Sequence, residues 1–331
     1  MKTAVEIFTE LGERLAAFGK DAHSYAAIER AVVENPWFFA DEIVAAVEAL
    51  RCDMLQRDKL QQWLSAYRLP ARVQPKRVAV IMAGNIPLVG FFDLLCVLSC
   101  GCAAIVKPSG KDRILMHYII ELLREIEPQI EIEECGNEEM DAVKVDAVIA
   151  TGNDNARRYF RSVYAGIPQL LRGNRHSVAV LSGKESDAEL ELLKSDIFCY
   201  SGLGCRNVSM VFVPIGYKLH LSGCPVNPKY RNNYLQNAAV LRMKGAEFTD
   251  SGSSLFVKGD DFSSSLSVVT VREYQTLAEV NEWLAIHDDE LQCVVSGCIE
   301  HSRRVGFGQS QHPGLTDYPD AVDVMAFLCK I

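Results

Sequence analysis

A cysteine stands in the stretch FCYSGLGCRNVSMVFVP, residues 198–214, just before an apolar run typical of a strand. Gly202 and Gly204 precede Cys205 and allow backbone angles and a close approach of ligand that other residues resist. Arg206 follows it and would favour the thiolate, which is the nucleophilic form of cysteine. Backbone N–H groups in such a loop can also stabilise an oxyanion. Cys205 is therefore a candidate nucleophile, and a buried structural cysteine beside two glycines is the alternative.

The cysteines as a group show no spacing that would hold a metal or form a redox pair. The chain has 11 of them, and no two stand in C-x-x-C spacing, so we expect neither a zinc site nor a thioredoxin-type pair. In a reducing compartment most of them would be small buried hydrophobic residues. Cys199 lacks the flanking glycines of Cys205 and is the weaker candidate.

Polar turns follow three apolar runs in the first half of the chain, RVAVIMAG, CAAIVKPSG and VDAVIATG. Ligands on parallel sheets bind beyond the carboxyl ends of the strands, so the candidate ligand-binding residues are 83–87, 107–111 and 151–154. Asn85 could direct its amide at a developing oxyanion, or it could cap a helix beginning near Pro87. Lys107 could bind a ribose hydroxyl or a phosphate, or it could be a solvated loop lysine.

Strand-like and helix-like segments alternate from Arg77 onwards, with glycine at several strand ends. This alternation predicts an α/β fold of parallel strands joined by right-handed crossovers. The preceding residues space their apolar side chains three and four apart, which indicates helices. We expect three parts, at residues 1–72, 73–198 and 199–331.

The composition argues against some classes of partner. Lys and Arg number 34 and Asp and Glu number 43, so the net charge is −9, whereas nucleic-acid binding requires a basic face. The N-terminus shows no signal peptide, and no apolar run approaches about 20 residues without a charge or a breaker. We expect a cytoplasmic protein with no membrane span and no nucleic-acid partner.

The chain resembles the bacterial long-chain acyl-CoA reductases, the LuxC-like fatty acid reductases of the aldehyde dehydrogenase superfamily. The motifs that carry the resemblance are AGNIPLVGFFDLLCVL, GLGCRNVSMVFVP, KYRNNY, LQCVVS and FGQSQHPGLTDYPDAVDVMAFL. The resemblance implies an aldehyde dehydrogenase-like fold with two Rossmann-like α/β domains and mostly parallel sheets. Residues 1–72 would be a helical segment packed on the cofactor domain at 73–198, and residues 199–331 would form the catalytic domain.

The resemblance also implies a thioester mechanism in which a fatty acyl-CoA is reduced to the aldehyde. Cys205 corresponds to the nucleophile and Asn85 to the oxyanion donor of the superfamily. Asn153 replaces the serine that the superfamily usually has in its T-G-S turn. The residues that would bind the nicotinamide cofactor are Lys107, Ser109, Gly110, Thr151, Gly152 and Asn153. No metal is implied.

Two departures from the superfamily pattern bear on the chemistry. Arg172 stands where hydrolytic relatives carry the glutamate that activates water, which suits an enzyme that reduces its acyl-cysteine rather than hydrolysing it. Gly110 and Lys111 stand where NAD-preferring relatives often have a glutamate, which favours NADPH, with NADH as the alternative. The glutamate of an E-x-F-G-P motif, which holds the nicotinamide ribose, is not evident in SLSVVTVREY.

The resemblance further implies a homo-oligomer and an acyl-protein synthetase as a possible partner. Two alternatives to the acyl-CoA reductase remain open. One is a non-catalytic subunit that binds acyl groups or a partner on the same scaffold. The other is a semialdehyde or acyl-phosphate reductase of the superfamily.

Overall fold

The computed structural model describes residues 2–70, 74–140, 143–221, 227–263 and 265–331. It divides into two compact units, Met1–Asn174 with Gly314–Ile331 and Arg175–Pro313. The sequence predicts a boundary at residue 198, whereas the units divide after Asn174 because the strand at His176–Val180 pairs with the second sheet. The C-terminal segment returns to the first unit.

The first unit begins with four helices that pack against the helices covering one face of its sheet. Thr3 starts the first of them with a capping box, and Asp21 caps the second. Their apolar residues share a core with the sheet and its helices. The four helices are α1 (Ala4–Leu15), α2 (Ala22–Glu34), α3 (Ala40–Asp53) and α4 (Arg57–Ser65).

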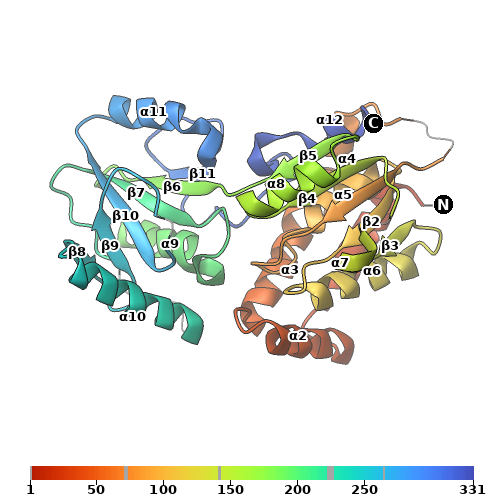
Figure 1. Cartoon of the computed structure of the whole chain (residues 1–331), viewed down its shortest axis with the longest axis horizontal. Coiled ribbons are helices and arrows are strands. Elements are labelled where there is room, and N and C mark those ends of the chain that lie inside the picture. Colours follow the sequence, from red (N-terminus) through yellow and green to blue (C-terminus); the bar gives the residue numbers. More distant parts are fainter. Residues whose placement is uncertain (1, 71–73, 141–142, 222–226, 264) are drawn as a thin grey trace. The chain divides into compact units, whose positions relative to one another are not determined.

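The sheet of the first unit has five parallel strands in the order β3-β2-β1-β4-β5. The strands are β1 (Arg77–Ile81), β2 (Ala103–Lys107), β3 (Ile132–Glu134), β4 (Ala147–Thr151) and β5 (Gln169–Arg172). The helices α5 (Phe91–Ser99) and α6 (Arg113–Ile126) cover one face, and α7 (Asn137–Met140) and α8 (Asp154–Val163) lie on the other (Figure 1). The short η3 (Pro319–Ala321) and α12 (Val324–Leu328) complete this unit.

In the described part of the second unit, the sheet has seven strands in the order β12-β11-β6-β7-β10-β9-β8, and only the β8–β9 pair is antiparallel. Helix α11 lies on one face, and α9 and α10 lie on the other (Figure 1). The strands are β6 (His176–Val180), β7 (Val208–Pro214), β8 (Phe248–Asp250), β9 (Leu255–Lys258), β10 (Val268–Tyr274), β11 (Leu291–Ser296) and β12 (Arg304–Val305). The helices are α9 (Asp187–Phe198), η1 (Cys199–Gly202), α10 (Pro228–Met243), α11 (Leu277–Ile286) and η2 (Asp288–Glu290).

The α/β architecture expected from the sequence is confirmed, with mostly parallel sheets and a helical N-terminal segment. The sequence pattern does not predict three short elements, which are α7, β8 and β12. None of the helices in the described part of the chain has both the length and the apolar character needed to cross a bilayer.

Candidate functional site

The predicted cofactor residues of the first unit lie along one edge of its sheet. Ile81, the last residue of β1, pairs with Lys107 at the end of β2 and with Ala150 next to the end of β4. The turns that follow these three strands therefore lie side by side at the carboxyl edge. From β1 the chain proceeds to β2 and β3 on one side of β1, and it then crosses to β4 and β5 on the other side. The strand order therefore reverses at β1. Open α/β sheets bind ligands at such a position.

The turn after β1 carries Asn85, which is half-buried. Helix α5 begins only at Phe91, its N-cap is Gly90, and no side chain caps it. The alternative in which Asn85 caps the next helix is therefore wrong. The predicted role of Asn85 as an oxyanion donor stays a prediction.

The turn after β1 packs against the turn after β2. The Met82 N–H donates to the Lys107 carbonyl at 3.0 Å, which extends the pairing of β1 and β2. A Cβ on Gly84 would lie 2.5 Å from the Ser109 Cβ, so only glycine allows this close approach. Three residues after Asn85, the Leu88 N–H donates to Oδ2 of buried Asp112 at 2.7 Å. Neither Leu88 nor Asp112 is predicted from the sequence, because a contact between two turns leaves no local pattern.

The turn after β2 has an open surface at the position that bears on cofactor choice. Lys107 and Ser109 are half-buried, while Gly110 and Lys111 are exposed. A Cβ on Gly110 would meet no atom within 4 Å, so this glycine is not required by packing. The Asn35 side chain donates to the Lys111 carbonyl at 3.1 Å and ties the turn to the end of α2. The turn offers an ammonium, a hydroxyl and an accessible backbone, which are groups that can bind a polar ligand.

The turn after β4 leads directly into a helix N-terminus. The Asn153 side chain accepts a hydrogen bond from the Ala156 N–H at 2.9 Å and so caps α8. A Cβ on Gly152 would lie 2.9 Å from the Ala156 Cβ, which explains the glycine. Helix N-termini favour anions through their N–H groups and dipole. The turn suits a phosphate-bearing ligand, while the Asn153 oxygen is already used by the cap.

Arg172 is buried at the end of β5 and forms an ion pair with Asp93 of α5. The distances are 2.5 Å from Nη1 to Oδ2 and 2.7 Å from Nη2 to Oδ1. Burial acts to lower the pKa of Arg172, but the Asp93 carboxylate outweighs it and the pKa is raised. Nη1 also lies 3.4 Å from the Thr151 hydroxyl. Arg172 is therefore a buried, paired residue and not a solvated one.

Cys205 lies in the second unit and is exposed. It precedes β7, so it stands at the amino edge of its sheet and not at the carboxyl edge. The Ser177 hydroxyl, near the start of β6, donates to the Cys205 carbonyl at 2.8 Å. The buried thiol of Cys293 lies 3.1 Å from the same hydroxyl, and burial raises the pKa of Cys293 to about 11. Cys293 is thus an unreactive neighbour, and Cys205 is accessible to a substrate.

Asn207 closes the loop that carries Cys205, and it is not among the residues predicted from the sequence. Its side-chain oxygen accepts the Gly204 N–H at 2.8 Å. Its amide donates to three carbonyls at the end of α9, those of Asp196, Ile197 and Cys199, at 3.2, 3.3 and 2.9 Å. These carbonyls would otherwise lack helical partners. One buried side chain therefore caps the helix and fixes the residue before the thiol.

The chain reverses between α9 and Cys205 through three consecutive left-handed residues. Tyr200, Ser201 and Gly202 have φ values of 53°, 55° and 71°. Non-glycine residues in this conformation cost of order 1–3 kcal/mol each and persist only where their surroundings impose them. Glycine at 202 removes part of that cost. The contacts of Asn207 on either side are well placed to hold the reversal.

Replacing Asn207 with alanine is expected to destabilise the protein by about 1–3 kcal/mol, because buried donors and acceptors lose their partner. The rate of Cys205 alkylation by iodoacetamide is expected to change as well, since the loop loses its tether to Gly204. Thermal unfolding and thiol-labelling kinetics check the two effects. Asn232→Ala, an exposed position on α10, is the control. Unchanged stability and labelling in Asn207→Ala would contradict the assignment.

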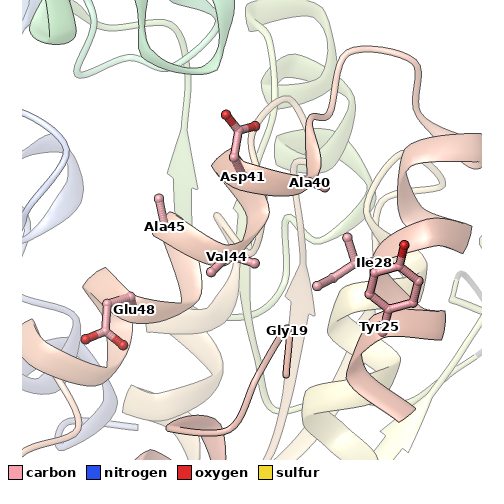
Figure 2. Close-up of a pocket in the computed structure, with 8 residues that line it drawn as sticks. All are labelled: Gly19, Tyr25, Ile28, Ala40, Asp41, Val44, Ala45 and Glu48. Atoms are coloured by element: carbon pink, nitrogen blue, oxygen red, sulfur yellow. The ribbon is translucent and has the colours of Figure 1, made fainter. Parts of the chain in front are cut away.

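A separate groove of about 500 Å³ lies in the helical segment between α2 and α3 (Figure 2). Its lining is mostly apolar and includes none of the residues at the carboxyl edge and no cysteine. It is formed by Gly19, Tyr25, Ile28, Ala40, Asp41, Val44, Ala45 and Glu48.

Comparison with known proteins gives consistent results. A profile of the family described as acyl-CoA reductase (LuxC) matches residues 37–222, more than half of the chain. No curated protein matches the sequence.

Several solved structures share the fold at low sequence identity. An oxidoreductase from Marinobacter aquaeolei is 14% identical with a TM-score of 0.66, over 94% of this chain and 78% of its own. An NAD-dependent aldehyde dehydrogenase from Sinorhizobium meliloti is 12% identical with a TM-score of 0.64, over 93% and 71%. A betaine aldehyde dehydrogenase from Staphylococcus aureus in complex with NAD+ is 14% identical with a TM-score of 0.61, over 89% and 72%. The fold is therefore aldehyde dehydrogenase-like.

Proposed function

Because the chain belongs to the LuxC acyl-CoA reductase family, we propose that it reduces a fatty acyl-CoA to the aldehyde with NADPH. Another activated acyl thioester could replace the CoA ester. The family and the fold indicate an oxidoreductase that acts on acyl or aldehyde substrates. The observation that carries the finer proposal is the exposed Cys205 on a loop that Asn207 holds at Gly204.

In this proposal the Cys205 thiolate attacks the thioester carbonyl carbon. The bond from that carbon to the CoA sulfur breaks, and CoA leaves as a thiolate that takes up a proton. The acyl group is then held on Cys205 as a new thioester. Addition of a hydride to the acyl carbon would give a thiohemiacetal alkoxide, and its collapse breaks the carbon–sulfur bond, releases the aldehyde and restores the Cys205 thiolate.

Asn85 and the Cys205 backbone N–H are the proposed donors to the oxyanion that forms during attack. The support for Asn85 is its place in the turn after β1, where it does not cap α5. A turn that packing has already fixed costs little reorganisation when charge develops on the substrate oxygen.

Lys107, Ser109, Gly110, Thr151, Gly152 and Asn153 would hold the cofactor at the carboxyl edge. When bound, the reduced nicotinamide supplies the hydride. The preference for NADPH follows from Gly110 and Lys111, which place no carboxylate where a 2′-phosphate would be repelled. NADH is the alternative.

Arg172 supports a reductive rather than a hydrolytic outcome. Its guanidinium is buried and paired with Asp93, so this position provides no base to activate water. An acyl-cysteine that persists can be reduced, whereas one that is hydrolysed yields only the acid.

The proposed activity is tested by following reduced-cofactor oxidation at fixed protein with a series of acyl-CoA chain lengths, using NADPH and NADH in parallel. Mass spectrometry without cofactor should show a hydroxylamine-sensitive acyl adduct on Cys205. An adduct without cofactor oxidation would favour a non-catalytic acyl carrier. Cofactor oxidation with acyl phosphates but not with acyl-CoA would favour the semialdehyde or acyl-phosphate reductase. An acyl-protein synthetase partner and a homo-oligomer remain parts of the proposal, tested by co-purification and light scattering.

Replacing Asn85 with alanine is expected to slow acylation about 100-fold, because removing one oxyanion donor typically costs about 3 kcal/mol. The fold should persist, since Asn85 does not cap α5. Single-turnover acylation and thermal unfolding measure the two effects, and Asn232→Ala serves as the control. An acylation rate within twofold of the wild type would remove Asn85 from the mechanism.

A further inference from the structure

Asp112 is a buried carboxyl group that the proposed reaction does not use. It is 4% exposed and stands at the start of α6, yet its side chain does not cap that helix. Carboxyl groups are rarely buried this completely unless they are paired. The bond that Asp112 makes is to a different turn, where Oδ2 accepts the Leu88 N–H at 2.7 Å. This bond joins the turn after β2 to the turn that carries Asn85.

Leu88 needs such a partner because of its backbone conformation. Its φ is +55°, in the left-handed region that non-glycine residues seldom occupy. Its carbonyl accepts the Phe91 N–H at 2.9 Å, so the conformation of Leu88 also sets where α5 begins. The contact with Asp112 satisfies the buried N–H of Leu88 and holds the strained residue in place.

Asn85 lies between two attachments of its turn to the same neighbouring turn. On one side, a Cβ on Gly84 would lie 2.5 Å from the Ser109 Cβ and 3.1 Å from the Asp112 Cβ. On the other side, Leu88 is bonded to Asp112. Both ends of the short segment that bears Asn85 therefore rest on residues 109–112.

The environment of Asp112 indicates a neutral carboxyl group. Burial raises the pKa of Asp112 well above its usual value, and the bond from Leu88 offsets only part of that effect. Within the described part of the chain, Oδ1 has no hydrogen-bond partner. A neutral group with one accepting oxygen is all that the contact with Leu88 requires, and asparagine supplies the same.

We infer that Asp112 is a positioning residue that holds Asn85 in place by accepting the Leu88 N–H. The inference rests on the proposed function, in which Asn85 stabilises the oxyanion. Asp112 touches neither substrate nor cofactor in this scheme. Its contribution is to keep the turn in one conformation while charge develops on the substrate, and a shift of about 1 Å in such a group can cost about 100-fold in rate.

The test compares Asp112→Asn with Asp112→Leu, two side chains of similar size. Asparagine keeps the acceptor, so acylation of Cys205 by an acyl-CoA should stay within threefold of the wild type. Leucine removes the acceptor, so acylation should slow by 10-fold or more, while the KM for the reduced cofactor stays within twofold. Alkylation of Cys205 by iodoacetamide, which forms no oxyanion, should be unchanged in both variants. A general loss of structure would change the alkylation rate together with the acylation rate.

Because Asp112 acts through Asn85, the Asp112→Leu change should have no further effect on acylation in an Asn85→Ala background. Additive losses would overturn the inference, as would an Asp112→Asn variant that is as slow as Asp112→Leu. If Asp112→Leu fails to fold, the Asp112→Asn result still decides, since a 10-fold loss there contradicts a neutral acceptor role. A wild-type protein that forms no acyl adduct would instead refute the proposed function. That result is distinguishable from the variant results that overturn the inference about Asp112.

Discussion

Cys205→Ala protein is expected to form no acyl adduct and to lose at least about 1,000-fold in aldehyde formation, because a covalent mechanism has no substitute for its nucleophile. The residue is exposed, and its loop is fixed through backbone and side-chain contacts that do not involve the thiol. Folding should therefore be unaffected. Incubation with a labelled acyl-CoA, followed by hydroxylamine and mass analysis, measures the adduct directly.

Two other cysteines provide matched controls. Cys52 is the second exposed cysteine of the described residues, but a hydrogen bond to Glu48 raises the pKa of its thiol, so it should be a poor nucleophile. Cys199 is half-buried and lies at the end of α9. Cys52→Ser and Cys199→Ala should keep nearly full acylation. Hydroxylamine-sensitive label in Cys205→Ala protein would show that another group carries the acyl chain.

The elements of the fold are visible in the sequence because each leaves a local pattern. Buried parallel strands such as RVAVI and AVIAT are continuous apolar runs followed by a turn, and amphipathic helices repeat every three to four residues. The division into units is less visible, because it depends on which sheet the strand at His176–Val180 joins. That choice depends on pairing with β7, whose residues follow in the next part of the chain, and with β11, where His176 pairs with Leu291 far along the sequence.

For the candidate site too, some features could be predicted from the local sequence, and others depend on contacts between residues far apart in the chain. Cys205 and the carboxyl-edge turns could be predicted from residue type and position. The contacts that hold them could not, because they join residues such as Leu88 and Asp112 that no motif links. The sequence alone does not distinguish a buried polar residue from a solvated one, because the difference depends on the neighbours that the fold brings to it. Asn207 had a usable signal, an asparagine two residues after the candidate cysteine.

Arg172→Met is expected to destabilise the first unit by about 3–5 kcal/mol, because it leaves the Asp93 carboxylate buried without its partner. The two side chains are only 4% and 6% exposed, so water cannot replace the guanidinium. The pair joins the end of β5 to α5, and Arg172 also reaches the Thr151 hydroxyl at the carboxyl edge of the sheet. Denaturant unfolding monitored by circular dichroism gives the change in the free energy of unfolding.

The double variant Arg172→Met with Asp93→Leu separates loss of the pair from loss of packing. An apolar replacement of both partners often restores stability, so the double variant should recover most of the loss. Arg172→Glu, which restores the residue type of hydrolytic relatives, would place a second carboxylate beside Asp93. We expect it to unfold the unit without creating thioesterase activity. A folded Arg172→Glu protein that hydrolyses acyl-CoA would show that this position faces the acyl group, and a loss below about 1 kcal/mol in Arg172→Met would show that the pair is accessible to water.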